Sequence, residues 1–160
     1  MNSRCLRVFA VVGLLAGQGF APALASASES PGPTNLIVAY RIEGRPDKVD
    51  AATLQDNPKV EAYPILVITF ITSASQIERL NTLVAAEHKR AHNPSVCFYP
   101  GLALGFVDRA GVTNVFVCLE CRNLSGSKPD QLVGMSDEAF EEFSSLYTKL
   151  FASGKRGDAR

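Results

Sequence analysis

The sequence lacks several features that identify whole classes of protein. Its 160 residues include no tryptophan and only two histidines, and 16 Lys and Arg balance 16 Asp and Glu. Because a protein that grips a phosphate backbone needs an excess of basic residues, we expect no nucleic-acid binding. A Gly-rich phosphate loop, a nucleophile elbow and a His-Glu-x-x-His pair are also absent. The sequence therefore does not predict an enzyme.

No hydrophobic run reaches the ~20 residues that a membrane-spanning helix needs. The run from Val8 to Ala16 follows Arg4 and Arg7 and precedes the small residues of Ala23-Leu24-Ala25. This order is typical of a secretory signal peptide. We therefore predict a signal peptide over residues 1–25, cleaved between 25 and 27. The mature protein is then periplasmic or secreted and has no transmembrane anchor.

The mature chain has the length of one domain, and 46% of the whole sequence is hydrophobic, which is enough to build a core. Ser, Pro and Gly dominate the residues that follow the cleavage site. We expect a flexible leader over residues 26–34, a single domain over 35–152 and a disordered tail over 153–160.

Two separate segments have the composition of strands. Leu36 to Ile42 is rich in β-branched and aromatic residues and ends shortly before Gly44. Ile65 to Ile71 is a continuous apolar run that only Thr69 interrupts, which predicts a buried strand.

A hairpin is predicted further along the chain. Apolar strands from Gly101 to Val107 and from Val112 to Leu119 flank a short turn that ends in Gly111. Counting outward from this turn places Val107 opposite Val112.

Two segments have helical periodicity. Ser75 and Glu78 have the spacing of a capping box, and Asn93-Pro94 ends the helix that follows. Ser136 predicts the N-cap of a last helix. Its apolar stripe consists of Phe140, Phe143, Tyr147, Leu150 and Phe151. The order β-β-α-β-β-α predicts an α+β fold with a small antiparallel-rich sheet and two packed amphipathic helices.

Three cysteines stay in the mature chain, because Cys5 leaves with the signal peptide. The hairpin register places Cys97 near Cys121, with Cys118 close by. Paired strands bring opposing Cα atoms to ~4.5–5.5 Å, which is within disulfide range. In an exported domain, this arrangement predicts one structural disulfide, from Cys97 to Cys121 or to Cys118, and one free thiol.

Two alternatives to the disulfide stay open. Cys118-x-x-Cys121 has zinc-knuckle spacing, so Cys97 and either His88 or His92 would complete a zinc site. The two histidines are equally explained as an ordinary helix end, where cations suit the dipole. The other alternative is a periplasmic thiol-redox protein, although the residues after Cys121 do not begin the helix that lowers a thiol pKa in such proteins.

The cysteine pattern resembles that of an uncharacterised family of exported bacterial proteins. Its members carry a Cys-x-x-Pro-Arg element and then a hydrophobic strand that ends in Cys-x-x-Cys. Cys97-Phe-Tyr-Pro100 and Val117-Cys-Leu-Glu-Cys121 match this pattern, whereas Gly101 stands in place of the arginine. The resemblance covers Tyr63 to Arg122 and implies the three-cysteine site but no activity.

Together these patterns predict a small exported binding domain. Its ligand is either a protein partner or a soft metal such as zinc, and no other cofactor is expected. A thiol-redox protein is the alternative function.

Overall fold

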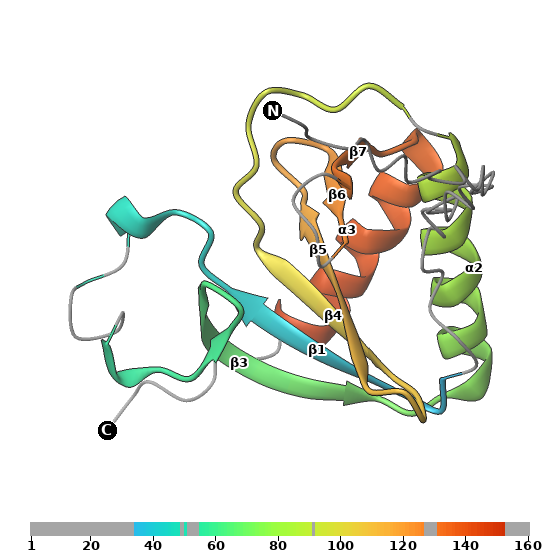
Figure 1. Ribbon diagram of the computed structural model, residues 1–160, viewed down its shortest axis with the longest axis horizontal. Coiled ribbons are helices and arrows are strands. Elements are labelled where there is room, and N and C mark those ends of the chain that lie inside the picture. The colour runs from blue at the N-terminus through green and yellow to red at the C-terminus, as the bar shows by residue number, and fades with distance from the viewer. Residues whose placement is uncertain (1–33, 49, 51–54, 91, 127–130, 153–160) are drawn as a thin grey trace, which may run out of the picture.

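The sheet is built around β1 (Leu36–Ile42), which pairs antiparallel with β3 (Tyr63–Ile71) on one side and with β4 (Leu102–Val107) on the other. The computed structural model describes residues 34–48, 50, 55–90, 92–126 and 131–152 (Figure 1). The predicted signal peptide, most of the leader and the predicted tail lie outside these residues.

In these described ranges, seven antiparallel strands form one sheet, in the order β2-β3-β1-β4-β5-β6-β7. Two long helices accompany them, which confirms the predicted α+β class (Figure 1). Besides β1, β3 and β4, the elements are η1 (Pro46–Lys48), β2 (Lys59–Val60), α2 (Ala74–Arg90), β5 (Val112–Cys118), β6 (Asn123–Ser125), β7 (Val133–Gly134) and α3 (Asp137–Phe151).

The predicted hairpin is formed by β4 and β5, and its register is confirmed. Val107 lies opposite Val112, and the Asp108 amide donates to the Gly111 carbonyl across the turn at 2.9 Å. Outward from the turn, Leu102 lies opposite Val117. This register places Cys118 at the open end of the hairpin.

Both helices pack against one face of the sheet, where the main core lies. This face carries Ile37, Leu104 and Val115, all of which are almost fully buried. The stripe predicted for the last helix is confirmed in part, because Phe143 and Phe151 are buried while its other members are partly buried. Ser136 is the N-cap, as predicted, and its side chain accepts a hydrogen bond from the Ala139 amide.

The opposite face of the sheet, which we call the open face, carries a smaller core. It contains Ala103, Phe116, Ile42, Val60 and Ile65, with Tyr40, Tyr63 and Phe98 packed around them. Neither described helix contributes to this core. Since paired residues share a face, β3 presents Ile68 and Phe70 on the open face, opposite Tyr40 and Val38.

The prediction that the apolar run of β3 is buried is confirmed only at its ends, Ile65 and Ile71, and is wrong for most of the residues between them. Leu66, Val67, Ile68 and Phe70 are 37%, 38%, 48% and 61% exposed. The physical reason is position, because β3 lies next to the end of the sheet and only the two-residue strand β2 flanks it.

Two local predictions also differ from the structure. The first long helix begins at Ala74, and the Ile77 amide donates to the Ser73 carbonyl, so Ser75 lies inside the helix and does not cap it. The segment between β5 and the last helix, for which the predicted order β-β-α-β-β-α has no strand, contributes two more strands, β6 and β7, because its backbone extends the sheet beyond β5. Among the described residues, no helix combines the length and apolarity needed to cross a bilayer.

Candidate functional site

The three cysteines come from three consecutive parts of the chain around the open end of the hairpin. Cys97 lies on the segment between α2 and β4, Cys118 ends β5, and Cys121 lies in the turn before β6. In this turn Arg122 has a φ of 53°, and its amide lies 3.4 Å from the Leu119 carbonyl oxygen. The chain therefore reverses immediately after Cys121, which brings that residue back towards Cys118.

Asn123 holds the Cys97 segment against this turn. Its side chain is 1% exposed, and its Nδ2 donates to the carbonyl oxygens of Ser95 (3.0 Å) and Cys97 (2.8 Å). Its Oδ1 accepts from the Ser95 amide at 3.0 Å. The Ser95 hydroxyl in turn donates to the Cys121 carbonyl at 2.7 Å. A buried side-chain amide needs partners for its donors and its acceptor, and Asn123 finds them only while the Ser95–Cys97 segment stays in this position. Asn123 therefore fixes where Cys97 lies relative to Cys121.

The side chains of Cys97 and Cys121 are neighbours. A hydrogen bond between the two side chains raises the pKa of Cys97, burial adds to this, and the Ser95 side chain opposes it. Cys97 is partly exposed while Cys121 is 7% exposed, and both are free thiols in this structure. An accessible thiol, Cys97, therefore lies beside a buried one, Cys121, and the raised pKa of Cys97 disfavours its thiolate form.

Cys118 has different surroundings. It is fully buried, and its Sγ accepts the amide hydrogens of Cys121 (3.2 Å) and Tyr99 (3.4 Å). Backbone amides thus surround its sulfur. The nearby Tyr63 has a raised pKa, first because it is buried and then because Glu61 and Cys118 oppose a negative charge there.

The two histidines do not join the cysteines. His88 lies on α2 with its Nδ1 2.9 Å from the Val84 carbonyl oxygen, and His92 is exposed and forms an isolated bridge with Gly134. In the part of the chain that the structure describes, no three His, Cys, Asp or Glu side chains are grouped closely enough to hold a metal ion. The zinc site stays a prediction.

Sequence reasoning missed the polar residues that position this site. Asn123 gave no signal because its partners lie 26 to 28 residues away along the chain. Glu87 is fully buried, and its carboxylate accepts from the Ser136 amide (2.7 Å) and hydroxyl (2.9 Å) and pairs with Arg90 (2.6 Å). It thereby ties the end of α2 to the beginning of α3, next to the strand that follows the cysteines.

A small cleft of about 270 Å³ opens beside the cysteine turn. Arg45 pairs with Glu120 at this cleft and lies over the ring of Tyr99, with 5.5 Å between the guanidinium carbon and the ring centre. The lining residues are Ile42, Glu43, Arg45, Tyr99, Pro100, Gly101, Leu119, Glu120 and Tyr147. Because its arginine already has a carboxylate partner, the cleft shows no free cation for an anionic ligand.

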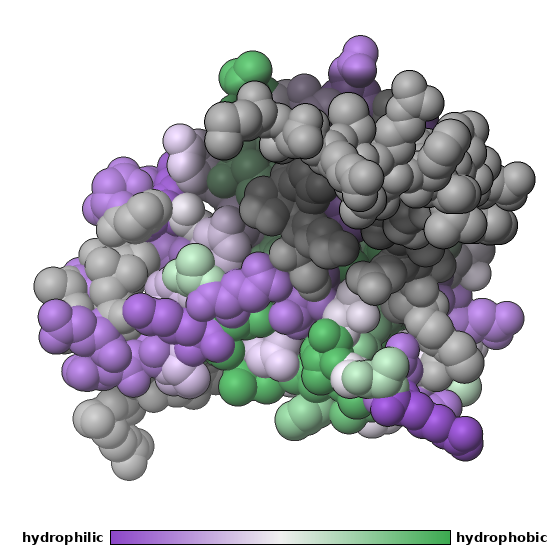
Figure 2. All heavy atoms as spheres, viewed as in Figure 1, coloured by the Kyte–Doolittle hydropathy of each residue, from purple (hydrophilic) through white to green (hydrophobic). Residues whose placement is uncertain are grey.

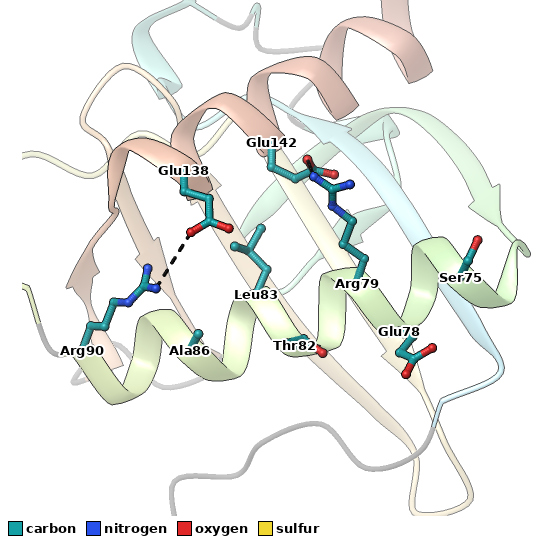
Figure 3. A pocket seen from close by; sticks show the side chains of 9 residues that line it. All are labelled: Ser75, Glu78, Arg79, Thr82, Leu83, Ala86, Arg90, Glu138 and Glu142. Atoms are coloured by element: carbon teal, nitrogen blue, oxygen red, sulfur yellow. Dashed lines mark hydrogen bonds and ion pairs between the residues drawn. The ribbon is translucent and has the colours of Figure 1, made fainter.

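A larger cleft of about 470 Å³ lies between α2 and α3 (Figure 3). Arg79 and Arg90 of α2 point across it towards Glu142 and Glu138 of α3, with nitrogen–oxygen distances of 2.6 Å and 3.9 Å (Figure 3). These ion pairs connect the two helices, so the charged groups of the cleft serve helix packing.

Comparisons with family models, with curated proteins and with solved structures give no match for this chain.

Proposed function

We propose that this protein is an exported binding domain in which Cys97 and Cys121 form a structural disulfide and Cys118 is the unpaired thiol. The observation that carries the proposal is that the Ser95 hydroxyl lies 3.9 Å from the Cys97 Sγ and donates to the Cys121 carbonyl at 2.7 Å, which places the two cysteines beside each other. Asn123 supports it, because its bonds to Ser95 and Cys97 hold the two chain segments together independently of the thiols. The cysteine pattern and the signal-like N-terminus point to the same compartment.

The disulfide forms by exchange with an oxidant of the disulfide class, such as a disulfide oxidase of the exporting compartment. One cysteine thiolate attacks a sulfur of the oxidant, which forms a mixed disulfide and releases the oxidant's first thiolate. The second cysteine thiolate then attacks the protein sulfur of the mixed disulfide and releases the oxidant's second thiolate. Cys97 and Cys121 together lose two electrons and two protons. The oxidant takes up both and leaves as two thiols.

The thiol-redox alternative has less support. A catalytic cysteine needs a lowered pKa, which a helix N-terminus or a neighbouring cation supplies. The pKa of Cys97 is instead raised, and the residues after Cys121 begin the strand β6. We therefore assign the pair a structural role.

Mass spectrometry of exported protein tests this proposal. The full chain is expressed with its own N-terminus and recovered from the periplasm. We expect material that begins close to Ser26 or Ser28, with an intact mass about 2 Da below that of the reduced protein. Alkylation followed by digestion should give a linked Cys97–Cys121 peptide and a modified Cys118.

Three results would overturn the proposal. These are a bond that includes Cys118, three alkylated cysteines, or a metal that a chelator removes from the native protein. The same chain without residues 2–25, expressed in the cytoplasm, is the control and should keep all three thiols reduced.

A further inference from the structure

One edge of the sheet has free backbone along most of its length. β2 pairs only with Tyr63 and Pro64, and the next residue, Ile65, has its amide bonded to the Pro58 carbonyl. The Ile65 carbonyl accepts from the Asn57 side chain at 3.1 Å. Within the described part of the chain, no strand lies beside β3 on this side from Leu66 to Ile71. The edge therefore presents unpaired backbone donors and acceptors.

This edge is also apolar and uncharged. Figure 2 shows hydrophobic surface along the lower border of the view, where β3 runs in Figure 1. Ile68 and Phe70 are 48% and 61% exposed on the open face. The sequence from Tyr63 to Ile77 contains no charged residue. Proteins protect a free edge with charges, prolines or bulges. Beyond Pro64 and the register shift next to Ile65, β3 has none of these, and such an edge is typical of strand pairing between chains.

We propose that a second copy of this chain occupies the edge, with the two β3 strands antiparallel across a two-fold axis at Thr69. The inference rests on the binding role proposed above but not on the thiol pair. The axis stands perpendicular to the sheet, so the open faces of both copies form one continuous surface.

The position of the axis follows from what lies beside β3. Pro58 and Asn57 bond to Ile65, and the register of β1 and β3 shifts between Ile65 and Val67. An added strand can therefore extend only as far as Val67. The regular free segment is Val67–Ile71, and its centre is Thr69.

The side chains in this register favour a second copy over an unrelated strand. With Thr69 on the axis, Ile68 of each copy lies opposite Phe70 of the other, and both residues share the open face. Aromatic and β-branched residues form favourable cross-strand pairs, and symmetry provides this pair twice. Because neither strand carries a charge, no like charges meet when the copies pair.

The expected dimer is weak. The exposed apolar residues of β3 number four, Leu66, Val67, Ile68 and Phe70, so the contact is small compared with obligate dimers. We expect a dissociation constant of roughly 10–100 µM.

Sedimentation velocity of the mature protein tests this inference. Between about 1 µM and about 500 µM the sedimentation coefficient should rise from that of a monomer to that of a dimer. Ile68→Lys should weaken association at least ~10-fold, because it places a charge opposite Phe70 of the other copy. Val112→Lys is the matched control, since Val112 is 54% exposed on β5, away from the β3 edge, and should not change association.

The register has its own test. Thr69→Cys should form a disulfide-linked dimer under mild oxidation, because residues on the axis face each other at ~4.5–5.5 Å. Val112→Cys, at a site that is 54% exposed and lies away from the β3 edge, controls for random cross-linking.

Thermal melts first establish that each variant is folded. A monomer at every concentration, or equal association of Ile68→Lys and the parent, would overturn the proposal. Cross-linking of Thr69→Cys no faster than that of Val112→Cys would overturn the register. None of these results depends on the disulfide mapping, so the two proposals fail separately.

Discussion

Cys97 combines access to solvent with a thiol that resists ionisation. Its neighbour Cys121 raises the pKa of Cys97 above the ordinary cysteine value, so the reactive thiolate appears only at higher pH. In the fully reduced protein, we expect the alkylation rate of Cys97 to rise with a midpoint above that of a free cysteine. Iodoacetamide labelling at a series of pH values, read by peptide mass, measures this midpoint.

Two substitutions complete the alkylation experiment. Cys121→Ala removes the hydrogen-bonding side chain and should move the midpoint of Cys97 towards lower pH. Cys118→Ser is the control and should leave the midpoint in place, because Cys118 is bonded to the amides of Tyr99 and Cys121. A parent midpoint at or below that of free cysteine would contradict the assigned hydrogen bond.

At the level of single residues, the sequence predicted that Cys97 and Cys121 lie near each other, but it did not predict which residue holds their two chain segments in place. Counting along the hairpin predicted that Cys97 lies near Cys121. The β4–β5 register on which this count depends is confirmed, whereas the disulfide itself stays a prediction. Asn123 could not be found in this way. Its role depends on a loop whose path is irregular and set by tertiary contacts.

The segment from α2 to β4 is held by close backbone contact at a glycine. A Cβ atom on Gly44 would lie 2.5 Å from the Pro100 nitrogen, whereas at Gly101 it would meet nothing within 4 Å. We expect Gly44→Ala to lower the free energy of unfolding by about 1–3 kcal/mol, because the segment must move outward. Gly101→Ala, in the same region, should have an effect within about 0.5 kcal/mol. Urea unfolding measures both, and equal effects would show that this contact does not hold the segment.

Among the elements, the sequence predicted those whose signals are local. The hairpin has a short turn between two alternating strands, and α3 has a capping serine followed by two acidic residues. The exposure of β3 was not predictable, because an apolar run is the same whether its strand lies inside a sheet or near its end. The strands β6 and β7 are too short to have a periodicity of their own.

For the whole molecule, the proposed disulfide has a measurable effect on stability. It closes a loop of about 25 residues and should contribute about 3 kcal/mol to the free energy of unfolding. We expect Cys97→Ser and Cys121→Ser to lose this contribution in protein recovered from the periplasm. Cys118→Ser should retain it, and calorimetry with and without reductant makes the comparison.

The calorimetry has a clear contrary outcome. If reductant shifts the melting temperature of the parent no more than that of Cys97→Ser, the bond does not stabilise the fold. The double variant Cys97→Ser with Cys121→Ser should be insensitive to reductant, which controls for effects of the reagent itself.

The place of β1 between β3 and β4 has a consequence for how the chain folds. β1 comes first along the chain, but its pairing with β4 joins Leu36 to Val107, and the Thr34 hydroxyl bonds to the Val107 carbonyl 73 residues away. Contacts at such separations form slowly, while the β4–β5 hairpin is local and forms fast. β1 therefore lacks one of its two neighbouring strands until the chain has been made as far as Val107. Before that point β1 can pair only with β3, so the sheet cannot be completed from its N-terminal strands alone.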